Sequence, residues 1–386
     1  DGQVLTSTGS GVGWEDAAGG VTFKAFGTSS IMVGDDATGT ISAANYNTGL
    51  GVDVFAALTS GDNNVAVGYN AGAGITTGTL NTFIGGLAGD ATTTASDNTG
   101  VGAASMGGNT TGTRNTALGS DSLKVSTEGN DNTAIGKGSL AANTTASNNT
   151  AVGKNSLTAN TTGAQNTAVG QGAGESNTTG VSLVALGRQA LEANTEGDFN
   201  TALGQRALFK NTTSDDNTAV GNQALGENTT GARNTAVGAD ALDANTTANN
   251  NTAVGRSSLG ANTTGTFNTA SGRQALLSNT TGDNNVAVGG NALYQNTTAD
   301  DNTAVGAYSL DANTTGNSNV AVGTSSLSAN TVGDRSVAVG YNALLVQNPD
   351  SNVDMYNVAV GYAAGAAVTT GTNNTLIGGL AGDAIT

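Results

Sequence analysis

The sequence contains no cysteine, no histidine and only one proline, Pro349, in 386 residues. Without cysteine and histidine, disulfides, thiol nucleophiles, serine–histidine pairs and histidine metal sites are all excluded. Positive charge is also scarce, because 12 Lys and Arg against 29 Asp and Glu give a net charge of −17 at pH 7. This charge argues against nucleic acid and anionic membranes as partners. No stretch is apolar enough to be inserted in a membrane.

Aromatic residues (4%) and charged residues (11%) are few, and taken alone this composition would suggest disorder. A strict repeat argues against disorder. The glycine that ends the motif NTAVG falls at every seventeenth residue from Gly34 to Gly340, then at Gly361 after one step of 21, and at Gly378. A fixed period of this kind is the signature of a solenoid, in which each repeat packs on its neighbours.

The consensus of the repeat is N-T-A-V-G-x-x-A-L-x-x-N-T-T-G-x-x, numbered here as positions 1 to 17, with about 21 copies from residue 30 onward. Two helices need about thirty residues, and each glycine in a helix costs about 1 kcal/mol, so a helical repeat is excluded. Alternation at positions 2–4 predicts a short strand, and a second short strand is expected at positions 8 and 9. The fold class predicted is all-β, a parallel β-solenoid (β-roll).

Stacked coils place the same position of each repeat in a column, with neighbours about 4.8 Å apart. Asparagine amides then bond along the column, while glycine and asparagine permit the left-handed backbone of tight turns. The predicted structural ladders are represented by Asn166, Val169, Gly170, Asn177, Asn217, Val220, Gly221, Leu225, Asn228, Asn234, Val237, Gly238, Leu242 and Asn245.

The valine at position 4 and the leucine at position 9 are expected to be buried, each contributing about 1.5–3 kcal/mol. Ordering 17 backbones costs on the order of 17–34 kcal/mol, so further burial is needed. Ala219, between Thr218 and Val220, points to the opposite face from both. A column of such alanines is a smooth apolar strip, which predicts association, most simply as a parallel homotrimer. The alternative is a single-chain solenoid with alanine facing its own interior.

The repeat N-T-A-V-G-x-x-A-L resembles the S-V-A-I-G-x-x-A/S head repeat of trimeric autotransporter adhesins, the YadA-type β-roll. It is more similar still to the NTAIG-x-x-AL-x-x-NTTG repeats of long phage tail-fibre proteins and related bacterial surface proteins. The resemblance covers about residues 30–386. It implies a trimeric β-roll that mediates attachment, although 17 residues make a longer coil than the usual YadA-type repeat.

Four segments are expected: 1–29 outside the repeat, irregular coils 30–106, a regular shaft 107–344, and terminal coils 345–386 with a four-residue insertion. The first holds Trp14, Phe23 and Phe26, which predict either a cap over the first coil or a docking segment for another subunit. Residues 357–386 nearly repeat residues 64–93. This reflects either block duplication or a shared packing environment that permits head-to-tail self-association.

Three patterns offer groups that could bind a ligand or be modified. The Asn-Thr-Thr triplets match glycosylation acceptors but are explained as turn ladders. Asp215 with Asp216, Asp300 with Asp301, and Asp283 offer oxygens for calcium but are interpreted as solvated corners. The adjacent threonines at positions 13 and 14 point to opposite sides and cannot form one flat ice-binding face. No catalytic residue, cofactor site or metal site is predicted.

The predicted function is therefore non-enzymatic: the shaft of a phage tail fibre or similar extracellular appendage that attaches to a host-surface receptor. Absence of cysteine suits an exposed, extracellular part. The first alternative is a bacterial surface adhesin or self-stacking extracellular filament. The second alternative is a polysaccharide-cleaving tailspike, although the carboxylates are too scattered to indicate a glycosidase pair.

Overall fold

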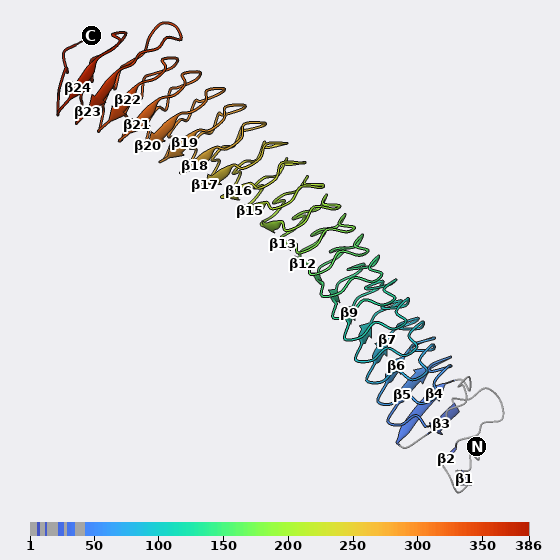
Figure 1. Cartoon of the computed structure of the whole chain (residues 1–386). Coiled ribbons are helices and arrows are strands. Elements are labelled where there is room, and N and C mark those ends of the chain that lie inside the picture. Colours follow the sequence, from blue (N-terminus) through green and yellow to red (C-terminus); the bar gives the residue numbers. More distant parts are fainter. Residues whose placement is uncertain (1–5, 8–11, 14–21, 27–28, 35–42, 386) are drawn as a thin grey trace. The chain divides into compact units, whose positions relative to one another are not determined.

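The computed structural model describes residues 6–7, 12–13, 22–26, 29–34 and 43–385. The chain divides into two units, one formed by residues 1–189 and 194–196 and the other by residues 190–193 and 197–386. Within the described residues each unit consists of short strands and turns, with no helix. The segment that separates each strand from the next is a chain of turns, so that one strand occurs per coil (Figure 1).

In the first unit, β4 to β13 pair in parallel, each with the next strand in the sequence. Before them, β1 pairs antiparallel with β2, and β3 pairs antiparallel with β4. The strands are β1 Thr6–Ser7, β2 Val12–Gly13, β3 Thr22–Phe26, β4 Ser30–Gly34, β5 Thr48–Gly51, β6 Val65–Val67, β7 Thr82–Ile84, β8 Thr99–Val101, β9 Thr116–Leu118, β10 Thr133–Ile135, β11 Thr150–Val152, β12 Thr167–Val169 and β13 Val184–Leu186.

In the second unit, β14 to β24 pair in parallel in the same sequential order. These strands are β14 Thr201–Leu203, β15 Thr218–Val220, β16 Thr235–Val237, β17 Thr252–Val254, β18 Thr269–Ser271, β19 Val286–Val288, β20 Thr303–Val305, β21 Val320–Val322, β22 Val337–Val339, β23 Val358–Val360 and β24 Thr375–Ile377. Ala219 lies opposite Ala236, one repeat later. The prediction of an all-β parallel solenoid with a 17-residue repeat is confirmed.

The second strand expected at positions 8 and 9 is wrong, because this part of each coil is a run of turns. Positions 7 and 9 adopt left-handed backbone, with φ of 55° at Gln223 and 52° at Leu225, which a strand cannot accommodate. Their amides still bond between coils. Gln223 N donates to Gln205 O at 3.0 Å, and Leu225 N donates to Ala241 O at 3.0 Å. The turns therefore provide hydrogen-bond partners for the backbone amides between coils, as a strand would.

The expected orientation of the strand is also wrong. Ala219 and Ala236 are fully buried beside Leu225, whereas Val237 is 36% exposed. The interior of a coil is narrow, because the leucine of position 9 and the asparagines of positions 1 and 12 already occupy it. Only a small side chain fits at position 3, so the strand turns its alanine inward and its threonine and valine outward. The alanine strip is consequently core and is not available to another chain.

Exceptions at position 3 show that it shares one space with position 9. Phe83 replaces the usual alanine and is fully buried, and Gly89 replaces the leucine of the same coil. A Cβ on Gly89 would lie 2.5 Å from the Phe83 ring, and one on Gly100 would lie 2.9 Å from it. Leu376 and Gly382 repeat this exchange, since a Cβ on Gly382 would lie 2.8 Å from Leu376. The similarity of residues 64–93 and 357–386 thus includes a common solution to core packing.

Candidate functional site

The asparagines of position 12 form a hydrogen-bonded column inside the coils of each unit, from Asn143 to Asn194 and from Asn211 to Asn330. Asn228 Nδ2 donates to Asn211 Oδ1 at 2.9 Å and to Gly231 O at 2.9 Å. Asn245 Nδ2 in turn donates to Asn228 Oδ1 at 2.8 Å. These asparagines are fully buried. Each amide therefore ties its own turn together and connects to both neighbouring coils.

The asparagines of position 1 form a second column that also supports the backbone. Asn217 Oδ1 accepts the backbone N–H of Asn234 at 3.0 Å and its Nδ2 at 3.2 Å. Asn234 Nδ2 also donates to Ala248 O at 2.8 Å, and Asn234 Oδ1 accepts the backbone N–H of Asn251 at 3.0 Å. One side chain thus serves three successive coils. A buried amide with all its partners present stabilises the fold and is unavailable for other chemistry.

This geometry also bears on glycosylation. The asparagine of each Asn-Thr-Thr triplet lies at position 12, and Asn228 and Asn245 are fully buried, with the amide nitrogen of Asn228 donating to three acceptors and that of Asn245 to two. Attachment of a sugar to that nitrogen would require the coil to open. The triplets therefore act as turn ladders in the folded chain.

The position-12 column is interrupted in the first unit, where Ser126 replaces the asparagine. Asn109 Oδ1 in the preceding coil and Ser126 Oγ are both buried and have no hydrogen-bond partner. In the following coil, Asn143 Nδ2 donates to Ala146 O. An unpaired buried acceptor costs about 1–3 kcal/mol.

We expect Ser126→Asn to stabilise the first unit by about 1 kcal/mol, because the new amide can donate to Asn109 Oδ1 and accept from Asn143. The measurement is the free energy of unfolding in urea. Thr111→Asn, at an exposed position 14, is the matched control and should leave stability unchanged. Equal gains in both variants, or a loss in Ser126→Asn, would contradict the assignment of a ladder defect.

The outward surface of the strands is formed by positions 2 and 4, and we call these residues the sheet face. From Thr48 to Ile377, position 2 is always threonine or valine, and position 4 is always valine, leucine or isoleucine except at Ser271. No residue of the face is charged, although the chain carries 41 charged residues. Such a long uncharged surface with aliphatic columns is typical of a protein–protein contact rather than of free solvent-facing sheet.

Exposed aromatic residues occur beside this face, at position 17 before the strand and at position 6 after it. They are Tyr46, Tyr69, Phe199, Phe267, Tyr341, Tyr356 and Tyr362. Tyr341 and Tyr362 stack with ring centroids 5.5 Å apart and an interplanar angle of 12°. Aromatic residues at the edges of an uncharged surface are characteristic of interfaces.

Among the acidic residues considered for calcium, Asp215, Asp216 and Asp301 are exposed, and Asp283 and Asp300, both at position 16, are half-buried. Asp283 and Asp300 occupy consecutive coils, and their carboxylates are used as hydrogen-bond acceptors by the backbone. Asp283 Oδ1 accepts from Thr266 N at 2.5 Å, and Asp300 Oδ1 accepts from Asp283 N at 2.7 Å. Among the described residues there is no group of three acidic, histidine or cysteine side chains placed to hold a metal ion.

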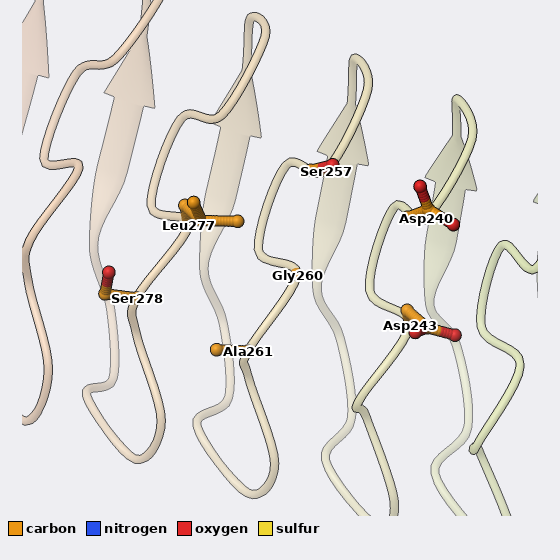
Figure 2. Close-up of a pocket in the computed structure, with 7 residues that line it drawn as sticks. All are labelled: Asp240, Asp243, Ser257, Gly260, Ala261, Leu277 and Ser278. Carbon is orange, nitrogen blue, oxygen red and sulfur yellow. The ribbon is translucent and has the colours of Figure 1, made fainter.

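A shallow surface pocket of about 370 Å³ lies over three successive coils of the second unit. Figure 2 shows Asp240 and Asp243 on one coil, with Gly260 on the next and Leu277 beyond it. Gly260, at position 10 of its coil, lines the pocket without a side chain. Burial raises the pKa of Asp243, and the charges of Asp240 and Glu227 raise it further.

This pKa shift predicts that Asp243→Asn increases the stability of the fold in a pH-dependent way. A carboxyl whose pKa is higher in the folded state binds more protons when folded, so its ionisation lowers stability as pH rises. As pH rises, this loss of stability begins near the pKa of about 3.9 in the unfolded chain, and it is complete above the raised pKa of the folded chain. Asp243→Asn should therefore raise the unfolding midpoint at neutral pH, and this gain should vanish in acid below about pH 3.9. Asp350→Asn, in an exposed loop, is the control, and an equal gain at both pH values would contradict the prediction.

The side chains of the three residues expected to form a cap or docking segment lie outside the part of the chain that the structure describes. Trp14 lies outside the described residues. Phe23 and Phe26 lie in β3, whose backbone pairs antiparallel with β4, but their side chains are outside the description.

No protein-family model and no curated protein matches this sequence. Within the residues that the structure describes, no helix is long and apolar enough to cross a membrane. The site is therefore defined by its geometry: two internal asparagine columns and an external uncharged sheet face.

Proposed function

We propose that the chain is a non-enzymatic structural and attachment protein that forms the shaft of a phage tail fibre or similar extracellular appendage. The uncharged sheet face carries this proposal. The coils use their asparagines and the acids of position 16 as structural hydrogen-bonding groups, so the recurring polar residues serve the fold. Each coil presents the same threonine–valine surface to the outside, and such a repeated surface suits repeated contact with identical partners.

The sheet face supports a homotrimer packed on threonine and valine rather than on alanine. Strand spacing and side-chain width give each coil about 50 Å² of face. The ten parallel strands of the first unit and the eleven of the second then offer about 1,000 Å² in each chain. In a trimer each chain divides this face between two neighbours, so that each interface takes about 500 Å² from each partner and buries about 1,000 Å² in total, close to the lower limit for a specific interface. With a net charge of −17, copies repel one another through their other surfaces, so the uncharged face is favoured for contact.

A bacterial adhesin would use the same assembly and is kept as the alternative. Head-to-tail stacking of chains into a filament is disfavoured by one observation. β3 pairs antiparallel with β4, so the outer edge of β4 already has its hydrogen-bonding partner. A parallel coil from another chain would have to displace β3 first.

The test is the mass of the native particle in solution by light scattering over a range of concentrations. Three times the chain mass of 37.4 kDa supports the trimeric shaft. A single-chain mass at every concentration would overturn the proposed assembly. For the enzymatic alternative, release of reducing ends from host polysaccharide would overturn the non-enzymatic assignment.

A further inference from the structure

The sheet face is not uniform along the chain. Position 2 is threonine in most coils, but it is valine in three consecutive coils, at Val320, Val337 and Val358. With Val322, Val339 and Val360 at position 4 they form an array of six valines on β21, β22 and β23. Val320 lies opposite Val337, and Val337 lies opposite Val358. Other valines at position 2, such as Val184 and Val286, are flanked by threonine coils.

Aromatic residues border this array on both sides. On the side of position 6, Tyr341 (49% exposed) and Tyr362 (60% exposed) form the stacked pair. On the side of position 17, Tyr356 (50% exposed) accepts from Arg335 Nη1 at 3.0 Å and donates to Asp354 at 3.0 Å. Arg335 and Asp354 form an ion pair, so the border carries no unpaired charge from these groups. We call the six valines and three tyrosines the valine–tyrosine patch.

A periodic face creates a difficulty for any assembly that uses it. Shifting one copy by a coil, about 4.8 Å, places threonine and valine columns on equivalent columns again. The regular part of the face therefore stabilises many axial registers almost equally, as weakly patterned strands do. An assembly with one specific register needs a feature that occurs only once along the series of coils and whose burial stabilises the contact.

We infer that the valine–tyrosine patch is the contact that fixes the axial register between copies of this chain. The inference rests on the proposed homotrimer and adds which residues align it. Only one register brings each patch against the same patch of a partner, as a symmetric assembly of identical chains requires. In any other register, valines of the patch face threonine hydroxyls, which lose hydration without gaining a hydrogen bond. Tyrosine is among the residues enriched in interface hot spots.

The partner that binds the valine–tyrosine patch is a second copy of this chain, because the patch is continuous with the sheet face and is uncharged and apolar. An acidic or basic partner would have no complementary charge to recognise there. A copy of the same chain presents an apolar patch of identical dimensions, so that contact is self-complementary.

The test compares two triple variants with the same chemical change. V320T/V337T/V358T gives the patch the threonine that most other coils carry, so folding should be unaffected. V220T/V237T/V254T makes the same three changes on the sheet face outside the patch. We expect the first variant to weaken self-association at least about tenfold more than the second, measured by sedimentation equilibrium. Thermal unfolding of each variant checks that the coils remain intact.

Register is measured separately by crosslinking, which the absence of cysteine makes simple. Chains carrying Ser271→Cys are mixed in equal amounts with chains carrying Leu203→Cys and treated with a short bis-maleimide. In matched register these thiols lie four coils, about 19 Å, apart along the face, so only like-with-like products are expected. In the V320T/V337T/V358T background, mixed products should appear as the registers scatter, whereas in the V220T/V237T/V254T background they should not.

The outcomes separate the two proposals. A wild-type monomer would overturn the assembly and this inference together. A wild-type oligomer whose V320T/V337T/V358T variant keeps its affinity and gives only like-with-like products would overturn the register assignment alone. Equal weakening in both triple variants would show that binding is spread evenly along the face, and would also overturn it.

Discussion

Gly238→Ala is expected to destabilise the second unit by about 3–5 kcal/mol, which is large for the replacement of one hydrogen atom by a methyl group. Gly238 closes β16 with a φ of 137°, a conformation that side-chain-bearing residues rarely adopt. A Cβ there would also lie 2.6 Å from both the carbonyl carbon and the carbonyl oxygen of Gly255 in the next coil. Because those atoms belong to backbone stacked in register, they cannot move without separating the coils. The free energy of unfolding in urea measures the effect.

Gly290→Ala is the matched control, since a Cβ at Gly290 meets nothing within 4 Å. This substitution should be neutral or stabilise by up to about 1 kcal/mol, because alanine restricts the unfolded chain. If Gly238→Ala and Gly290→Ala unfold at the same urea concentration, close contact between coils at position 5 does not constrain the fold.

Asn234→Ala is expected to cost about 3 kcal/mol, the second large effect. The change leaves the backbone N–H of Asn251 without its acceptor, and it removes the Nδ2 donor from both Asn217 Oδ1 and Ala248 O. Asn234→Asp should cost still more at neutral pH, because a buried carboxylate would face Ala248 O and Asn217 Oδ1 without the amide hydrogens. Unfolding in urea at neutral and acid pH measures both, and the Asn234→Asp deficit should shrink in acid as the carboxylate is protonated.

The control for the asparagine column is Asn222→Ala, at an exposed position 6, where Asn222 Nδ2 lies 3.4 Å from Gln205 O. Its loss should change stability by less than about 0.5 kcal/mol. A cost for Asn222→Ala equal to that of Asn234→Ala would mean that the effect reflects asparagine removal in general rather than the buried column.

The period and the fold class could be predicted because the repeat places glycine, asparagine and aliphatic residues at fixed intervals. The direction of the strand could not be predicted in the same way. Alternation indicates that Ala219 and Val220 face opposite sides, but not which side is the interior. That choice depends on the turns at Gln223 and Leu225, whose left-handed backbone is held by hydrogen bonds to other coils. No local preference of glutamine or leucine favours that conformation.

A signal for the correct orientation was nevertheless present in the sequence. Position 3 changes together with position 9, as Phe83 with Gly89 and Leu376 with Gly382 show. Large residues at one position with glycine at the other indicate that both fill the same space. Position 4 shows no such compensation, and it tolerates the small polar Ser271. Comparing the repeats with one another would thus have placed alanine inside and valine outside.

The four-residue insertion has a consequence for how such a protein can change. It lies between Leu344 and Tyr356, yet Val337 and Val358 still pair in register across it. A coil can therefore be enlarged at one corner while the coils on either side keep their contacts, because each coil depends mainly on its nearest neighbours. By the same logic, unequal recombination between near-identical repeats can add or delete whole coils without any compensating mutation. The number of coils is then a heritable property that selection can adjust independently of the chemistry of the surface.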